Sequence, residues 1–197
     1  VIKGVNGPVV TVVGGHGLAM MDMVHVGEEG LIGEVVGVNG GVTTVQVYED
    51  TAGLAPGQRV ESTGAPMSVK LGPGLLSNIF DGIARPLRVI EEKAGPFITR
   101  GINISALDEE KLWDTEIALK VGDEVKPGTL YATCRETTLI THRCLAPIGV
   151  TGKVTRVMPD GAYNVNKVLV EVTDEYGRMS GLKLSQECRI RTPRPMA

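Results

Sequence analysis

The chain has 197 residues, a formal net charge of −3, three Cys and 26 Gly, and a direct count also gives 26 Val. Hydrophobic residues make up 42% and charged residues 22%, which is ordinary for a globular protein and excludes intrinsic disorder. The near-neutral charge argues against a nucleic-acid or membrane-surface protein, and no apolar run approaches the roughly 20 residues that span a bilayer. Abundant Val and Gly with seven aromatic residues instead indicate short strands joined by many turns.

The two ends and the cysteines add three expectations. The N-terminus shows no signal-peptide pattern and has no starting Met, so we expect a trimmed chain. Cys134, Cys144 and Cys188 form no CxxC pair, and their odd number favours reduced thiols in the cytosol. The chain stops after Thr192-Pro193-Arg194-Pro195, an extended linker, and looks cut there.

The first 70 residues predict a small closed barrel. Asn39-Gly40-Gly41 is the strongest hairpin signal in the chain, and Pro56-Gly57 suits a type II turn. Short apolar or alternating runs at regular spacing predict six strands, and closure would remove exposed sheet edges. The predicted strands are residues 9–13, 20–26, 31–38, 42–48, 59–61 and 68–71.

Residues 73–98 have a different character and predict a short helical connector. Apolar residues recur at helical spacing over 75–80, and Asp81-Gly82 would end that helix. Residues 87–93 follow Pro86 and could form a further turn or strand.

Residues 118–172 predict a second β unit. Strands are expected at 130–133, 138–144, 149–157 and 165–172, with a turn at Gly161 and a final strand over 181–191. The stretches 120–130 and 146–154 resemble the two half-motifs of biotinyl and lipoyl domains, which form a barrel-sandwich hybrid. A carrier domain would need a Lys at the hairpin tip, expected near 136–138, where none occurs. A biotinyl/lipoyl-like non-catalytic interaction domain therefore stays open as an alternative.

No pattern predicts a catalytic, cofactor-binding or metal-binding residue. Gly152-Lys153 is followed by Val154, with Pro147 where a phosphate loop needs its first Gly, so it is interpreted as a strand start. His142 with Cys134 and Cys144 offers no four-ligand zinc spacing.

Other candidate residues also have ordinary interpretations. His16 and His25 lack a partner in a recognisable nucleophile motif. The acidic pairs and triplets at 91–92 and 108–110 are interpreted as solvated faces, and the sequon at 103–105 has no meaning in a reduced compartment. An RNA-binding barrel is disfavoured because residues 1–71 hold a single aromatic, Tyr48, and three Lys or Arg.

Several long motifs, in order and at plausible spacing, closely resemble the N-terminal part of the catalytic A-type chain (alpha chain) of V/A-type rotary ATP synthases. The resemblance covers essentially the whole chain. It is carried by the opening residues 3–10 and by the stretches 26–35, 46–54, 64–76 and 79–87.

The resemblance implies an all-β fold and an assembly role. Residues 1–72 would form the six-stranded barrel of the family's crown, 73–98 a connector, 99–190 the "bulge" insertion, and 191–197 a linker toward a nucleotide-binding domain. The implied partners are B subunits in an alternating A/B hexamer and stalk subunits reached through the bulge, with no nucleic acid and no membrane insertion. ATP and magnesium would bind the full-length catalytic chain, which synthesises or hydrolyses ATP coupled to proton or sodium transport. This stretch would carry no nucleotide site, and the implied location is cytoplasmic, peripheral to the membrane.

Overall fold

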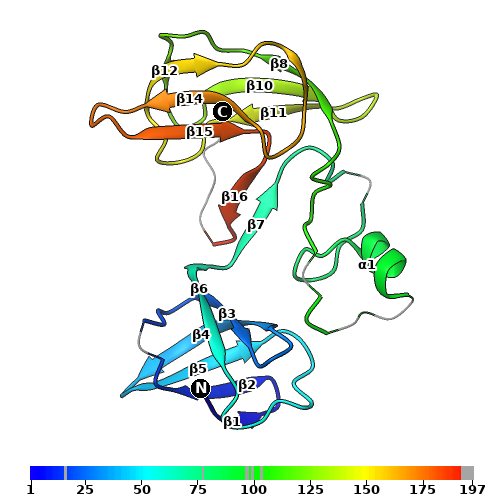
Figure 1. The fold of residues 1–197 in the computed structure, drawn as a ribbon, viewed down its shortest axis with the longest axis vertical. Coiled ribbons are helices and arrows are strands. Elements are labelled where there is room, and N and C mark those ends of the chain that lie inside the picture. The colour runs from blue at the N-terminus through cyan, green and yellow to red at the C-terminus, as the bar shows by residue number, and fades with distance from the viewer. Residues whose placement is uncertain (16, 77, 96–97, 99, 103, 192–197) are drawn as a thin grey trace. The chain divides into compact units, whose positions relative to one another are not determined.

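The fold is described from a computed structural model, which covers all residues except 16, 77, 96–97, 99, 103 and 192–197 (Figure 1). Contacts divide the chain into two compact units. The first combines Val1–Ser68 with Val89–Asn103, and the second combines Val69–Arg88 with the chain from Ile104 onward. Each unit is built around its own hydrophobic core, so each is described separately.

Six antiparallel strands form the first unit, drawn blue to cyan in Figure 1. Their order in the sheet is β1-β2-β5-β4-β3-β6. They are β1 (Ile2–Asn6), β2 (Val9–Val13), β3 (Asp22–Val26), β4 (Leu31–Asn39), β5 (Val42–Val47) and β6 (Val60–Pro66).

The sheet closes between its two edge strands. The Ile2 amide of β1 donates to the Gln58 carbonyl at 2.9 Å, and the Gly57 amide donates to the Ile2 carbonyl at 2.9 Å. Gly57 and Gln58 lead directly into β6, the strand at the opposite edge of the sheet. Backbone groups that would otherwise be exposed along an edge are therefore paired, as the predicted six-stranded barrel requires.

Alternation along the strands fills the barrel with branched aliphatic side chains. On β2, Val10 and Val12 are buried, while Val9 faces outward and is 37% exposed. Each fully buried aliphatic side chain contributes about 1.5–3 kcal/mol relative to leaving it in water. The core consists of Ile2, Val10, Val12, Val24, Val26, Leu31, Val35, Val45 and Val47.

The predicted hairpin is confirmed, but two strand assignments at the ends of the barrel were wrong. Gly40 and Gly41 form the turn between β4 and β5. The sixth strand is β1, which was missed because Lys3, Gly4 and Asn6 give it no apolar alternation. Residues 68–71 form β7 (Ser68–Leu71), which pairs with β16 (Gln186–Arg189) in a separate two-stranded sheet and does not belong to the barrel.

Two four-stranded antiparallel sheets form the second unit, in the orders β11-β10-β8-β13 and β15-β14-β12-β9. One contains β8 (Trp113–Ile117), β10 (Leu130–Arg135), β11 (Thr141–Leu145) and β13 (Gly161–Tyr163). The other contains β9 (Glu124–Val125), β12 (Gly152–Val157), β14 (Val168–Thr173) and β15 (Met179–Lys183). Buried side chains from both sheets share one core, which includes Trp113, Tyr131, Val154 and Leu169, so the predicted all-β barrel-sandwich architecture is confirmed.

Strand details of the second unit differ from the prediction for identifiable reasons. Gly161 was predicted to be in a turn, but it begins β13 and pairs with Thr115 of β8. Strand β8 was missed because one of its inward positions is the polar Thr115, whose hydroxyl is satisfied by the Trp113 carbonyl at 2.8 Å. The predicted strand 181–191 is interrupted at Ser185, whose amide and hydroxyl both donate to the Val165 carbonyl.

The helix lies in a different place from the one predicted. Residues 75–80 are not helical, because the amides of Gly74 and Leu76 donate to the Glu136 carboxylate instead of to helix carbonyls. Among the described residues the single α-helix is α1 (Leu87–Ala94). It begins after Pro86, a residue suited to a helix start, and buries Ile90.

Gly152 provides a sharp test of the barrel-sandwich packing. Its φ is +142°, and a Cβ there would lie 2.2 Å from the Thr173 carbonyl oxygen on the neighbouring strand. Gly152→Ala would combine backbone strain with a clash against main chain that cannot move aside, so we expect a loss of about 2–4 kcal/mol in the free energy of unfolding. Urea denaturation measures this change.

Gly177→Ala is the matched control, because Gly177 also has a positive φ (+78°) but nothing lies within 4 Å of the added methyl group. We expect a smaller loss of about 1 kcal/mol from strain alone. Equal losses in the two variants would contradict the packing described for Gly152.

Candidate functional site

The described residues contain no group of three or more His, Cys, Asp or Glu side chains that could hold a metal ion. Gly152 and Lys153 begin β12, as the sequence predicted, and Lys153 pairs with Glu124 and Thr173 in the sheet. Both residues are therefore part of a regular antiparallel ladder and not of a loop that could wrap a phosphate.

The cysteines near His142 are buried strand thiols. Cys134 and Cys144 are 3% and 2% exposed on the neighbouring strands β10 and β11. Burial raises the pKa of Cys134 to about 11 and that of Cys144 to about 12. Both groups therefore stay protonated at neutral pH, when the thiolate is the form that binds metals or attacks electrophiles.

The histidines lie apart from one another in local contacts. His142 Nδ1 lies 3.3 Å from Glu136 Oε2. His25 Nδ1 lies 3.2 Å from the Gly30 carbonyl oxygen, across the β3–β4 turn. His16 lies outside the described residues, as does Asn103 of the sequon.

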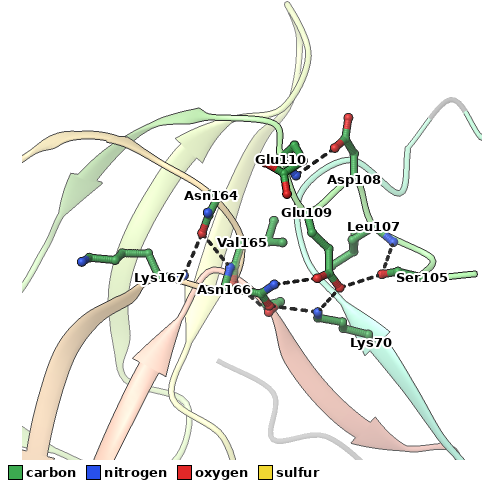
Figure 2. A network of polar contacts seen from close by, with 11 residues as sticks. Lys70, Ser105, Leu107, Asp108, Glu109, Glu110, Asn164, Val165, Asn166 and Lys167 are labelled. Carbon is green, nitrogen blue, oxygen red and sulfur yellow. Dashed lines mark hydrogen bonds and ion pairs between the residues drawn. The ribbon is translucent and has the colours of Figure 1, made fainter.

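The most connected polar cluster of the second unit is centred on Glu109 (Figure 2). Lys70 of β7 donates to Glu109 Oε1 at 2.6 Å, and Asn166 donates to Glu109 Oε2 at 2.8 Å. The Ser105 hydroxyl adds a third hydrogen bond at 3.0 Å, and Lys70 also donates to Asn166 Oδ1 at 2.9 Å. The carboxylate thus joins β7, the segment before β8 and the turn before β14.

These contacts correct the interpretation of the acidic stretch 108–110 as a merely solvated face. Hydrogen bonds from Lys70, Asn166 and Ser105 lower the pKa of Glu109 to about 2. Asp108 accepts hydrogen bonds from the amides of Glu110 and Lys111. The stretch therefore ties loops together, and a carboxyl group that stays ionised at all moderate pH values is unsuited to acid–base catalysis.

A second carboxylate shapes the loop at Asp81. Burial would raise the pKa of Asp81, but hydrogen bonds from Arg85 and from the Ile83 amide outweigh it, so the pKa is lowered. The Arg85 guanidinium lies 2.7 Å from Asp81 Oδ2 and is itself buried. The loop is closed by a bridge between Phe80 and Pro86, so the most distinctive part of the 79–87 motif forms a tight, self-bonded turn.

Glu136 does the same at the β10–β11 hairpin. Its carboxylate, whose side chain is only 4% exposed, accepts hydrogen bonds from the amides of Gly74 (2.7 Å) and Leu76 (3.2 Å). The hairpin loop over 136–140 holds the position expected for a carrier lysine, and it contains no Lys.

Glu49 plays this part in the barrel unit. It accepts hydrogen bonds from the Ile32 amide at 3.2 Å and from the Gly101 amide at 3.1 Å. The neighbouring Arg100 donates to the carbonyls of Asp50 and Ala52 and lies 3.4 Å from the Glu29 carboxylate. Arg100 and Gly101, which follow the connector, are thereby fastened to one end of the barrel, and we call this two-residue segment the strap.

Sequence reasoning missed all four of these carboxylates, because their partners lie on other loops. The only signal available was their position outside regular strands. Their chemistry is structural, since each captures backbone amides or a cation and so satisfies polar groups in segments without regular structure. Within the part of the chain that the structure describes, no helix is long and apolar enough to cross a membrane.

Replacing Glu109 by Gln tests the network. A carboxylate with a lowered folded-state pKa stabilises the fold above its unfolded value of about 4.5, and this contribution disappears as the pH falls toward 2. Solvent screens the pair because the Glu109 side chain is 39% exposed, so we expect Glu109→Gln to cost about 1 kcal/mol or less at pH 7.

Chemical denaturation of both proteins between pH 7 and pH 2 measures the difference, which should shrink to nothing at the acid end. Glu110→Gln is the control, since its carboxylate makes no hydrogen bond to any described residue. A difference that persists unchanged at pH 2 would contradict the electrostatic origin of the effect.

Comparison with known proteins assigns both units. Residues 2–64 match the family model described as "ATP synthase alpha/beta family, beta-barrel domain". Residues 104–191 match the model described as "ATPsynthase alpha/beta subunit barrel-sandwich domain". The two matched ranges contain the closed barrel and the paired four-stranded sheets.

Similar proteins occur in several organisms. The chain is 47% identical to the V-type ATP synthase alpha chain of Halothermothrix orenii, over 97% of this chain and 32% of that protein. It is 47% identical to the V-type ATP synthase alpha chain 2 of Clostridium tetani, over 99% and 33%. It is 43% identical to the catalytic A-type chain of the V-type proton ATPase of Cyanidium caldarium, over 100% and 34%.

The chain therefore spans about a third of the length of these curated relatives. Both domain matches name one family, and the matched ranges coincide with the two architectures built from the strands above. This chain belongs to the ATP synthase alpha/beta family, whose β-barrel domain and barrel-sandwich domain it carries.

Proposed function

We propose that this chain serves assembly within the catalytic A-type chain of a V/A-type ATP synthase. The whole catalytic chain would make or hydrolyse ATP coupled to proton or sodium transport, in the cytoplasm and peripheral to the membrane. The observation that supports this division of labour is that the charged groups of the described residues tie loops together. ATP and magnesium would then bind outside this stretch.

The barrel is proposed to contact B subunits in an alternating A/B hexamer. Its outer surface carries apolar side chains that a monomer has no reason to expose: Val36 is 42% exposed, Val38 is 49% exposed and Met20 is 53% exposed. The Met21 amide donates to the Val35 carbonyl, which places residues 20–21 beside this part of β4. Neighbouring exposed apolar side chains are typical of a protein–protein contact.

The barrel-sandwich domain is proposed to contact other parts of the complex, including stalk subunits. It differs from the barrel in having hairpin loops with exposed apolar tips. Such a role needs surface chemistry and no catalytic group, in agreement with the structural use of its carboxylates.

The isolated chain should not bind ATP. Without a phosphate-binding loop there is no set of backbone amides to cradle the phosphates, so we expect no heat of binding when Mg·ATP is titrated into the chain up to 1 mM, a concentration of about the upper range of enzyme substrate affinities. Micromolar, magnesium-dependent binding in a calorimeter would overturn this proposal.

A substitution on the barrel surface tests the assembly role. Val38→Glu in the full-length catalytic chain places a charge where an apolar contact is proposed, so we expect at least a tenfold smaller fraction of A/B hexamer when it is co-expressed with its B partner. Native mass spectrometry measures the hexamer fraction.

Val121→Glu is the matched control, because Val121 is 65% exposed and lies in the other unit. Circular dichroism should be unchanged in both variants, since neither residue is buried. Hexamer yields that are equal to wild type for Val38→Glu would argue against this face of the barrel as the contact.

A further inference from the structure

A groove of about 670 Å³ lies on the outer side of the β10-β8-β13 part of the barrel-sandwich domain. Its floor is formed by outward-facing side chains of β8 and β10, and one wall is the hairpin loop between β10 and β11. The volume falls within the range of natural ligand-binding clefts. None of the structural carboxylates described above lies in its lining, so the groove is free of the contacts that hold the fold together.

The floor of this groove is acidic. Asp114 and Glu116 occur two residues apart on β8, which puts both side chains on the same outer face, and both are exposed. Asp160 lies beside them and holds the Ile117 amide at 2.8 Å. The lining contains one cation, Arg135, whose guanidinium donates to the Thr138 carbonyl at 3.2 Å. The groove therefore carries excess negative charge.

The wall is apolar at its rim. Leu139 is 93% exposed, and Ile140 beside it is 47% exposed. The loop that carries them is not loose: the Leu139 and Ile140 amides both donate to the Thr137 hydroxyl, and the Glu136 amide donates to the Ile140 carbonyl. A leucine held in water by a hydrogen-bonded loop is pre-ordered for binding, which lowers the entropic cost of docking.

The strands beneath the groove cannot accept an added strand. Both edges of β8 are already paired, with β10 and β13, and both edges of β10 are paired, with β8 and β11. Recognition in the groove must therefore use side chains alone. An amphipathic helix satisfies this condition, because it presents side chains on every face and needs no backbone partner.

From this combination we propose that the groove binds an amphipathic helix of a partner protein, with apolar residues against Leu139 and Ile140 and Lys or Arg residues over Asp114 and Glu116. The assignment rests on the proposed role of the barrel-sandwich domain in contacting neighbouring parts of the complex. It specifies that contact by its face and by the chemistry of its partner.

The test uses the 197-residue chain and a synthetic helical peptide of Leu and Lys about 18 residues long, with Leu at i, i+3, i+4 and i+7 spacing. We expect amide NMR shifts to change at 114–116, 133–141 and 160–161 on addition of the peptide. Fluorescence anisotropy then gives the affinity, and Leu139→Ser and Glu116→Lys should each weaken it at least tenfold. Both side chains are exposed, so thermal unfolding should be unaffected.

Two control variants test whether binding is merely cationic or sticky. Met179→Ser and Glu175→Lys change an exposed apolar side chain and an exposed carboxylate on the β14–β15 hairpin, and both should leave the affinity unchanged. A peptide with Glu in place of Lys should not bind.

Three outcomes would overturn the proposal: shifts located on the acidic barrel residues, equal losses in the control variants, or no binding of the Leu/Lys peptide. The hexamer test on Val38 uses a different domain and a different partner, so it can succeed while the groove fails. Failure of this inference is therefore distinguishable from failure of the proposed assembly function.

Discussion

Closure of the first sheet is the constraint from which the rest of the barrel unit follows. A Val-rich sheet with open edges would pair with other chains, and the reciprocal hydrogen bonds of Ile2 with Gly57 and Gln58 remove that hazard. Closure also fixes which faces point inward, so that nine small aliphatic side chains suffice for a core that lacks aromatic residues. With the edges used internally, the barrel has only side chains left for contacts with other proteins, and Val36 and Val38 on its outer face have that character.

Outside the strands, carboxylates organise the chain. Glu49, Asp81, Glu109 and Glu136 each accept hydrogen bonds from backbone amides or from cationic and amide side chains in segments without regular structure. A loop buried without such partners would leave polar backbone groups unsatisfied, at a cost of about 1–3 kcal/mol each. In this part of an ATP synthase family protein, the acidic side chains with the most hydrogen bonds are therefore used to order loops.

The sequence was informative where local patterns decide structure. Alternation and turn residues predicted the all-β class, most strands and the hairpin at Gly40-Gly41. It failed where a partner far along the chain decides: β1 has no alternation of its own, β7 pairs with the distant β16, and the helical spacing of 75–80 loses to Glu136. The role of Glu109 was hidden for the same reason, because Lys70 and Asn166 approach it only in the folded domain. The groove depends on a hairpin and a sheet face that no local pattern joins.

The strap at Arg100 and Gly101 has a consequence for synthesis on the ribosome. The barrel strands are complete at Pro66, but the amide that Glu49 binds at Gly101 follows about 35 residues later. At about 5–20 residues per second, the nascent barrel can close roughly 2–7 s before its strap emerges. The barrel must therefore survive that interval on strand closure and its aliphatic core, and the connector is drawn back only afterwards. Order of emergence thus separates the barrel, which can form at once, from the strap, which can be added only late.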